Sequence, residues 1–308
     1  MKILITGGAG FIGSHVADAC IGLGHRVVVV DDLSTGSREN LNGAAEFVKM
    51  DIRDEGLSEL FRRETFDVVI HHAAQMDVRK SVEDPVFDAS VNILGSLNLL
   101  RNCTAHGVRK VIFASTGGAI YGEQDSFPAG EDHPLRPVSP YGVSKLSVEK
   151  YLSYFSVVHG LEHVALRYGN VYGPRQNPHG EAGVVAIFAG RMLAGEAPII
   201  NGDGMQTRDY VFVEDVVAAN VLALGYRESG VFNIGTGIES SVNRLFGIIR
   251  GMAMPECPEK HGPAKRGEQL RSCLDASLAR KRLGWKPAVA LEEGLRRTVE
   301  FFRKKRDT

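Results

Sequence analysis

MKILITGGAGFIGSHVADACIGLGHRVVVVDD (residues 1–32) opens the chain, and this stretch decides the fold. Met1 to Thr6 is a short apolar run typical of a buried strand, and a glycine-rich turn follows it before the apolar side of a helix begins. Arg26 to Val30 is a second β-branched run, and it ends in Asp31. Strand, glycine turn, helix, strand and acid in this order predict a dinucleotide-binding unit, whereas a glycine-rich turn alone precedes helices of many kinds.

Each spaced glycine of the turn has a physical reason. Gly7 can take the tight turn off the strand, Gly10 lets the backbone approach a pyrophosphate, and Gly13 lets the helix lie against the sheet. The free N–H groups and the positive end of the helix dipole then receive the phosphates. The Asp31 carboxylate is placed to accept the adenosine ribose hydroxyls, and it would repel a 2′-phosphate, so the sequence favours NAD over NADP.

Bulk composition limits the classes of function. The 308 residues suggest one large domain or two closely joined domains, and a hydrophobic fraction of 44% is ordinary for a globular protein. Lys+Arg 36 against Asp+Glu 37 gives no net attraction to nucleic acid, and no stretch approaches the ~20 apolar residues of a membrane span. Four cysteines without metal-like spacing, and the absence of a secretory pattern, favour a cytoplasmic setting. We therefore expect no nucleic acid partner, no membrane association and no metal.

Strand signals continue after the opening unit. Glu46 to Met50 is predicted as a third strand, and it leads into Asp51 and Ile52, an acid and an apolar residue that could bracket an adenine. Asp67 to His71 is the next predicted strand, and Ala73 follows it. A small side chain at that point would let a cofactor lie close to the backbone.

Three polar residues in apolar surroundings are ambiguous. His71 and His72 have no nearby acid or cysteine in the sequence, so packing is favoured over metal binding. A long helix is predicted from Asp84 to about Ala105, and Asn92 stands in its middle among apolar residues. Because buried amides need partners, Asn92 is either a structural hydrogen-bonding residue or a contact of the cofactor region.

The second informative stretch is STGGAIYG (residues 115–122), followed by SPYGVSK (residues 139–145). A predicted strand at 108–115 leads into the first segment, and Ser-Pro opens a helix in the second, so Tyr141 and Lys145 share one helical face. A cation beside a phenol lowers its pKa, as a positively charged nicotinamide would, and tyrosine could then serve as acid and base. Tyr-x-x-x-Lys is common on solvated helices, and its position downstream of a dinucleotide unit makes the motif informative.

With these motifs assembled, the chain resembles the extended short-chain dehydrogenase/reductases and, among them, the NAD-dependent epimerase/dehydratase family, most like its UDP-glucose 4-epimerases. This resemblance implies a reversible 4-epimerisation of a UDP-hexose (UDP-glucose and UDP-galactose) through a transient 4-keto sugar and bound NADH. It covers essentially the whole chain. The motifs that carry it are TGGAGFIG (6–13), STGGAIYGE (115–123), SPYGVSK (139–145), RYGNVYGPRQ (167–176), INGDGMQTRDYVFVEDV (200–216), FNIGTG (232–237), RGEQLRSCLD (266–275) and LGWKP (283–287).

The resemblance also implies roles for single residues. Tyr141 would be the catalytic acid and base, and Asn170 would touch the sugar diphosphate. Arg208 would pair with a phosphate, with a salt bridge to Asp209 or Asp215 as the alternative. The residues that would line the dinucleotide are Phe11, Ile12, Asp31, Asp51 and Ile52, with Lys145 on the nicotinamide ribose.

The glycine-rich segment departs from the family pattern. Gly117 stands where the family usually has a Ser or Thr that hydrogen-bonds the reacting oxygen. Thr116 is the expected substitute, with Ser115 or a water as alternatives. Gly118 and Ala119 stand where 4,6-dehydratases carry Asp-Glu, and neither can move a proton, so dehydration is disfavoured.

The C-terminal part departs as well. Lys265 stands where the family has an arginine, and Arg266 is beside it, so either could meet the diphosphate. Ser272 occupies the place of a bulky tyrosine in epimerases restricted to non-acetylated sugars, so we expect UDP-GlcNAc and UDP-GalNAc to be accepted too. The rival functions are another nucleotide-sugar 4-epimerase, such as one for a UDP-uronic acid, and a non-catalytic NAD-sensing protein. A sensor need not keep Tyr141 and Lys145.

The predicted fold class is α/β: a Rossmann-type doubly wound parallel sheet with a smaller, discontinuous α/β substrate-binding domain. Residues 1–169 plus about 209–237 would form the NAD-binding domain, and residues 170–208 plus about 238–308 would bind the nucleotide sugar, because VFVEDV and FNIGTG look like returns to the main sheet. The helices near 85–105 and 140–159 carry apolar residues on more than one side. In the family such a pair forms a dimeric four-helix bundle, so we expect a homodimer, unless the chain's own elements cover both faces.

Overall fold

A parallel sheet of seven strands forms the centre of the computed structural model, which describes residues 1–178, 183–264 and 269–307. The strand order is β10-β6-β5-β4-β1-β2-β3, and every pairing in this sheet is parallel. Its strands are β1 (Lys2–Thr6), β2 (Arg26–Asp31), β3 (Glu46–Lys49), β4 (Val68–His71), β5 (Lys110–Thr116), β6 (Glu162–Tyr168) and β10 (Gly230–Ile234). The strand order reverses between β1 and β4, which is where doubly wound sheets bind their ligands.

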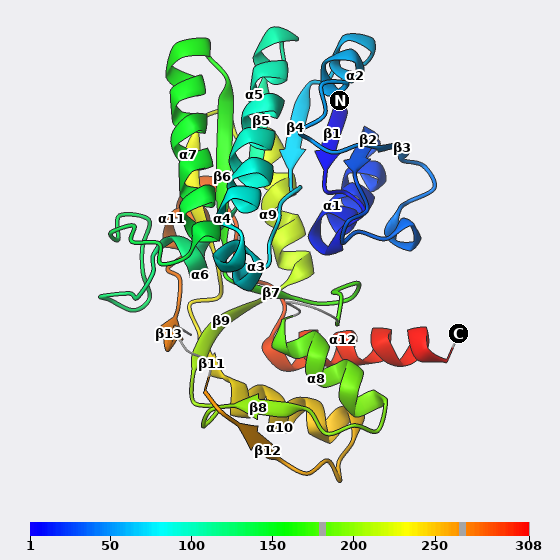
Figure 1. Ribbon diagram of the computed structural model, residues 1–308, viewed down its shortest axis with the longest axis vertical. Coiled ribbons are helices and arrows are strands. Elements are labelled where there is room, and N and C mark those ends of the chain that lie inside the picture. The colour runs from blue at the N-terminus through cyan, green and yellow to red at the C-terminus, as the bar shows by residue number, and fades with distance from the viewer. Residues whose placement is uncertain (179–182, 265–268, 308) are drawn as a thin grey trace.

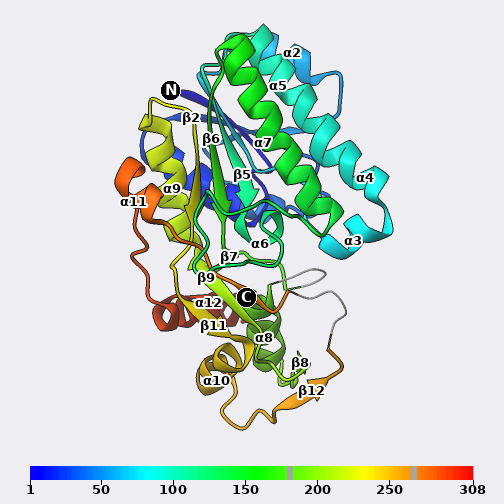
Figure 2. The same cartoon turned by 90° about the vertical axis from the view of Figure 1, so that its left-hand side faces the viewer.

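Helices cover both faces of this sheet (Figure 2). On one face lie α1 (Phe11–Gly22), α9 (Val213–Gly225) and α11 (Ser277–Leu283), and on the other lie α2 (Leu57–Arg63), α5 (Gly95–Ala105) and α7 (Pro140–His159). The sheet is buried on both sides, and this explains the continuous apolar runs of the sequence. The predicted Rossmann-type α/β fold is therefore confirmed.

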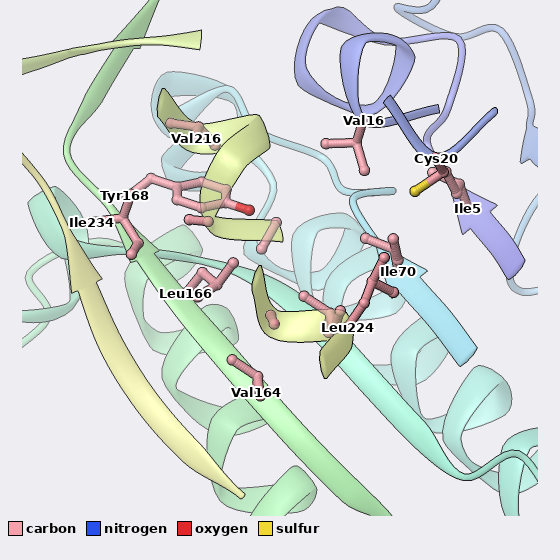
Figure 3. Close-up of a cluster of buried hydrophobic side chains, with 14 of the residues drawn as sticks. Ile5, Val16, Cys20, Ile70, Val164, Leu166, Tyr168, Val216, Leu224 and Ile234 are labelled. Atoms are coloured by element: carbon pink, nitrogen blue, oxygen red, sulfur yellow. The ribbon is translucent and has the colours of Figure 1, made fainter. Parts of the chain in front are cut away.

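Strand residues alternate between two hydrophobic cores, because successive side chains of a strand point to opposite faces. Ile3 and Ile5 pack with α1 and α9, whereas Leu4 between them packs with α2, α5 and α7. Figure 3 shows the first of these cores, with Ile5, Val16 and Cys20 on one side and Leu224 near the middle.

The long helix predicted from Asp84 to Ala105 is present in three parts. Asp84 caps its start by accepting a hydrogen bond from Phe87 N (2.8 Å), α4 covers Pro85–Ala89, a π-helical turn η2 covers Ser90–Leu94, and α5 completes it. The sequence prediction missed this widened turn and the short helix α3 (Val78–Glu83) that precedes it. The remaining short helices of the N-terminal part are η1 (Arg38–Asn40) and α6 (Gly117–Ile120).

Smaller sheets and three helices lie below the carboxyl ends of the main strands (Figure 1). A four-stranded sheet has the order β11-β9-β13 with β7 also paired to β9, and β8 pairs with β12. These elements share a third hydrophobic core that includes Phe188, Phe212 and Leu245. Their bounds are β7 (Asn170–Tyr172), α8 (Val184–Leu193), β8 (Ile199–Asn201), β9 (Thr207–Phe212), β11 (Glu239–Ser241), α10 (Val242–Ala253), β12 (Lys260–Gly262), β13 (Arg271–Ser272) and α12 (Leu291–Arg306).

One expected return to the main sheet is wrong. Phe232–Ile234 does lie in β10 of the seven-stranded sheet, but Val211 and Phe212 end β9 in the four-stranded sheet. The chain returns to the main body through helix α9, which packs on α1. The division into two domains stays a prediction.

The described helices include none that is both long enough and apolar enough to cross a bilayer. All four cysteines are buried and free of disulfide bonds.

Candidate active site

The glycine turn after β1 is held by the carboxyl ends of its neighbours. Gly7 has a φ of 70°, which favours glycine, and its N–H donates to Val30 O (2.8 Å) at the end of β2. A Cβ atom on Gly7 would lie 2.5 Å from Ala73 N, just after β4. The turn therefore fits between three strands only without a side chain.

Helix α1 begins at this turn with its first N–H groups uncapped by any side chain. Gly10 is the N-cap residue, and a Cβ atom on it would meet only Gly7 O, at 3.1 Å. A Cβ atom on Gly13 would lie 2.3 Å from Gly7 O, so Gly13 lets the helix approach the turn itself rather than the sheet. Phe11 and Ile12 form the first turn of the helix. This arrangement fits a pyrophosphate, which would accept from the exposed N–H groups.

Asp31 lies at the end of β2, with its carboxylate turned to the glycine turn. The carboxylate oxygens accept from Ala9 N (3.0 Å) and Leu33 N (2.8 Å). Burial raises the pKa of Asp31, although both hydrogen bonds oppose the increase. Each carboxylate oxygen has a second lone pair, so Asp31 can still accept from a ribose hydroxyl.

Asp51 and Ile52 follow β3, as predicted, but Asp51 has a partner that the sequence did not suggest. Arg53 Nη2 lies 2.6 Å from Asp51 Oδ2, and this contact lowers the pKa of the Asp51 carboxyl. Ile52 is buried, and a Cβ atom on Gly95 would lie 2.8 Å from Ile52 Cδ1. Their contact with an adenine stays a prediction.

Tyr141 and Lys145 lie in the first two turns of α7, whose start is capped by Ser139. Lys145 Nζ lies 5.8 Å from the centre of the Tyr141 ring and donates to Ala114 O (2.9 Å) in β5. The Lys145 side chain is only 4% exposed. The structure thus brings the predicted pair together beside the carboxyl end of β5.

Burial influences the ionisation of both residues of this pair. Burial lowers the pKa of Lys145 to about 8, and the negative charges of Asp88 and Glu149 oppose that decrease. Burial raises the pKa of Tyr141, and the negative charge of Asp88 raises it further. Burial and Asp88 therefore oppose the decrease of the phenol pKa that the sequence predicts from a neighbouring cation. A reactive phenolate needs additional positive charge, which an oxidised nicotinamide carries.

Two hydroxyls precede Gly117, and the structure separates their roles. Ser115 Oγ donates to Glu149 Oε1 (2.6 Å) within the protein interior. Thr116 Oγ1 accepts from Ala119 N (3.2 Å) as the N-cap of α6, and its own hydrogen remains available to a ligand. Thr116 is therefore the better placed of the two.

A buried ion pair behind the catalytic helix was missed by the sequence reasoning. Arg167 Nη2 lies 2.7 Å from Glu149 Oε2, and Arg167 Nη1 donates to Tyr121 Oη (2.9 Å). Tyr121 Oη donates in turn to Asn233 Oδ1 (2.7 Å). This network joins α7, β6, β10 and Tyr121, the residue that follows α6. The available signal was the spacing of Glu149 four residues after Lys145 on the same helical face.

His71 and His72 are packed side chains, as predicted. His71 Nδ1 lies 2.7 Å from Thr6 Oγ1 and its Nε2 lies 2.9 Å from Ser96 Oγ, while the His72 ring stacks on Tyr168. Across the described parts of the chain, no group of three or more His, Cys, Asp or Glu side chains is arranged to hold a metal ion.

Asn92 is a structural hydrogen-bonding residue, which is the first of the two roles that the sequence left open. It accepts from Gln75 N (2.9 Å) and donates to Gln75 O (2.9 Å) and Asp88 Oδ1 (2.9 Å). It therefore joins the segment after β4 to the helix α4–η2.

The predicted substrate residues that the structure describes lie on one small sheet. Asn170 in β7 pairs with Tyr210 of β9, and Ser272 in β13 pairs with Arg208 of β9. Arg208 Nη1 donates to Thr207 O (2.8 Å), and Ser272 is 2% exposed. Lys265 and Arg266 lie outside the described residues.

The two acids considered as partners of Arg208 have other contacts. The Asp209 carboxylate accepts from Thr236 N (2.7 Å) and Leu274 N (3.2 Å), and the Asp215 carboxylate accepts from Ala288 N (2.9 Å). Both acids thus fix distant segments to β9 and α9. The phosphate-binding role of Arg208 stays a prediction.

A doubly wound parallel sheet, an uncapped helix start in a glycine turn and a Tyr–Lys pair on one helix define a dinucleotide-dependent α/β enzyme. The chain belongs to the NAD dependent epimerase/dehydratase family, whose profile matches residues 3–235. Its cofactor is NAD. The glycine turn, where added Cβ atoms would collide with the backbone, and Asp31 at the end of β2 both suit this cofactor.

Known proteins resemble the chain over nearly its full length. A UDP-glucose 4-epimerase of Mycolicibacterium smegmatis is 48% identical over 312 residues, covering 99% of both chains. The crystal structure of a UDP-glucose 4-epimerase with UDP-glucose from Thermotoga maritima has a TM-score of 0.97 at 51% identity and covers 99% of both chains. A UDP-N-acetylglucosamine 4-epimerase from Methanobrevibacter ruminantium, in complex with UDP-N-acetylmuramic acid, has a TM-score of 0.94 at 37% identity and covers 99% of this chain and 98% of its own.

Proposed function

We propose that the protein catalyses the reversible 4-epimerisation of a UDP-hexose, interconverting UDP-glucose and UDP-galactose through a 4-keto sugar. The observation that carries this proposal is the pairing of Tyr141 with the buried Lys145 beside the carboxyl end of β5. The names of the similar proteins support the substrate class. Gly118 and Ala119 have no group that could protonate or deprotonate carbon, which disfavours elimination of water.

The glycine turn and Asp31 hold NAD, which supplies a reversible hydride acceptor when it is bound. Tyr141 takes the proton from the 4-hydroxyl of the sugar and returns it after the 4-keto sugar has turned over. Lys145 holds the ribose hydroxyls next to the nicotinamide and, as an ammonium, favours the phenolate of Tyr141. Thr116 donates its hydroxyl hydrogen to the reacting oxygen.

The small sheet below the site anchors the nucleotide end of the substrate. Arg208 pairs with a phosphate through its planar guanidinium, and Asn170 contacts the diphosphate. A Cβ atom on Gly118 would lie 3.9 Å from Asn170 Oδ1, which puts the amide of Asn170 next to the catalytic segment. Anchoring by the nucleotide leaves the sugar free to present either face to the same cofactor.

Ser272 sets the tolerance for an N-acetyl group. Its strand pairs with Arg208, so its small side chain lies next to the proposed phosphate site. We therefore extend the proposed substrates to UDP-GlcNAc and UDP-GalNAc. The similarity to a UDP-N-acetylglucosamine 4-epimerase supports this extension.

The purified protein incubated with UDP-galactose or UDP-GlcNAc, followed by chromatography of the products, tests the proposal. We expect UDP-glucose from the first and UDP-GalNAc from the second. Conversion of a UDP-uronic acid alone would favour the rival epimerase. NAD binding without conversion of any nucleotide sugar would favour a non-catalytic NAD-sensing protein.

The proposed active form is a homodimer. Apolar side chains on α4 and α7 are strongly exposed, with Val86 at 78%, Val157 at 87% and Tyr154 at 50%. A shallow cavity of about 490 Å³ lies between the two helices and is lined by Ala89, Ile93 and Val143, among others. Exposed apolar patches of this kind mark protein interfaces, and a second copy of the helix pair would cover them. Light scattering should give twice the chain mass, and Val157→Glu should give the single-chain mass.

The proposal also covers the division into domains and the cellular location. Residues 1–169 plus about 209–237 form the NAD-binding domain and the remainder forms the nucleotide-sugar domain, with β9 at the boundary between them. Four free cysteines suit a cytoplasmic protein, and cell fractionation tests that location.

A further inference from the structure

Asp88 is a buried carboxylate close to the proposed catalytic pair, and the mechanism above gives it no role. It lies in α4 and is 0% exposed. Its oxygens accept three hydrogen bonds, from Ser144 Oγ (2.6 Å), Asn92 Nδ2 (2.9 Å) and Gln75 Nε2 (3.1 Å). The two amide nitrogens can only donate, so the arrangement fits an ionised carboxylate.

The hydrogen bonds of Asp88 join three separate parts of the site. Ser144 stands on α7 directly before Lys145, Asn92 is in η2, and Gln75 follows β4. A second contact works in the same direction, since Tyr141 N donates to Ser81 Oγ (3.2 Å) in α3. The start of α7 is thus held against α3 through the Tyr141 N–H and against α4 through the Ser144 hydroxyl.

The negative charge of Asp88 is not cancelled by a direct ion pair. Its hydrogen-bond partners are all neutral side chains, and the ion pairs found among the described residues do not include it. Burying a carboxylate is unfavourable unless hydrogen bonds and nearby charges satisfy it. An alanine, asparagine or serine at this position would fill the same helix position without that cost.

We propose that Asp88 is a positioning residue for Tyr141 and Lys145: it clamps their helical turn to α4 and places a buried negative charge next to both. This inference rests on the proposed function, because it assigns Asp88 to the same reaction. The charge favours the ammonium form of Lys145 and opposes the phenolate form of Tyr141. Asp88 therefore keeps the lysine charged while it keeps the tyrosine protonated until substrate and cofactor are in place.

Among the charged groups that the structure describes around Tyr141 and Lys145, Asp88 is the one that acts on both. On α7, Glu149 acts on Lys145 and is itself paired with Arg167. At the end of β4, burial lowers the pKa of His71 and of His72 well below neutrality, so both are uncharged at working pH. On α3, Asp77 caps the helix, and Arg79 and Lys80 are exposed to solvent.

Removal of the Asp88 charge should move both limbs of the kcat profile to lower pH. Without Asp88 the phenol of Tyr141 ionises at lower pH, which moves the acid limb of the kcat profile to lower pH. Without Asp88 the ammonium of Lys145 is also lost at lower pH, which moves the alkaline limb the same way. A residue that only supported the fold would reduce kcat at all pH values without moving either limb.

The test compares Asp88→Asn with Ser144→Ala in the NAD-loaded enzyme. Asparagine is nearly isosteric, its oxygen can accept from Asn92 and Gln75, and its amide can donate to Ser144. We expect both limbs of its kcat profile to move to lower pH by about one unit. Ser144→Ala removes a hydrogen bond but no charge, so its limbs should stay at the wild-type pH even if kcat falls.

A second readout does not depend on turnover. The tyrosinate absorption of the NAD-loaded protein is titrated with pH, and the difference from the Tyr141→Phe protein isolates the phenol of Tyr141. Asp88→Asn should lower this midpoint, with Asp88→Ser as a second uncharged variant if the first does not fold. Unchanged midpoints and limbs in a folded uncharged variant would overturn the inference. Absence of epimerase activity in the wild type would instead count against the proposed function and leave the titration interpretable.

Discussion

Leu274 lies over Gly117 so closely that a Cβ atom on the glycine would be 2.4 Å from Leu274 Cδ1. The Leu274 N–H donates to the Asp209 carboxylate (3.2 Å), which restrains the backbone of the leucine, and its side chain is fully buried. A side chain at position 117, and therefore a hydroxyl, would have to displace the Leu274 side chain. This contact gives a physical reason for the glycine and leaves Thr116 as the nearest hydroxyl that can reach a ligand.

The first prediction concerns this pair. Gly117→Ser should destabilise the protein by about 1–3 kcal/mol, because it overpacks the contact with Leu274. Gly117→Ser combined with Leu274→Ala should regain part of that stability and offer a new hydroxyl. Thermal unfolding and kcat are measured for both variants, and for Leu274→Ala alone as the control for the lost leucine. Additive destabilisation in the double variant would show that the two side chains do not compete for space.

A related prediction assigns the hydroxyl. Thr116→Val should lower kcat by about 100-fold in the otherwise unchanged protein, because the reacting oxygen loses its donor. The same change should cost less in the double variant that carries Gly117→Ser and Leu274→Ala, since the new hydroxyl can take over. Ser115→Ala is the matched control, because Ser115 donates to Glu149 in the interior. An equal loss in both backgrounds would contradict the assignment of Thr116.

Tyr141→Phe should reduce turnover by about 1,000-fold or more while NAD stays bound, because it removes the proton donor and acceptor but no contact of the glycine turn. Turnover is measured with UDP-galactose, and bound NAD is measured after denaturation of the purified protein. Tyr151→Phe, on the more exposed part of α7, is the control and should behave as wild type. Turnover near the wild-type value in Tyr141→Phe would refute the role of Tyr141.

Local patterns in the sequence predicted the strands, turn and helices that form the dinucleotide half of the proposed site. Strand runs, the glycine turn and the spacing of Tyr141 and Lys145 depend on neighbouring residues and on helix or strand periodicity, which a sequence displays directly. Contacts such as Asp88 with Ser144, or Gly117 with Leu274, join distant segments and need the folded chain. The burial that raises the pKa of Tyr141 could not be predicted for the same reason, since the extent of burial is a property of the whole structure.

Ser272→Tyr should narrow the substrate range. Ser272 pairs with Arg208 and is almost fully buried, so a larger ring would take up space beside the proposed phosphate site. We expect kcat/KM for UDP-GlcNAc to fall at least tenfold, by the order of magnitude typical of steric exclusion, with a smaller change for UDP-galactose. Ser272→Ala keeps the space and should retain both activities. Equal losses for the two substrates in Ser272→Tyr would indicate general damage instead of selection.

His72 gives a prediction for stability against pH. Burial, with the Lys145 charge adding to it, lowers the pKa of His72 to about 3 from an ordinary 6.5. Between these values the unfolded chain binds a proton that the folded chain does not, so the free energy of unfolding falls as the pH falls below 6.5. The loss is about 1.4 kcal/mol per pH unit. His72→Gln removes this proton uptake, so its unfolding free energy, measured by urea titration between about pH 6.5 and pH 5, should depend less steeply on pH than that of the wild type. His159→Gln, at an exposed position, should keep the wild-type slope, and an identical slope in all three proteins would show that His72 is not held uncharged by the fold.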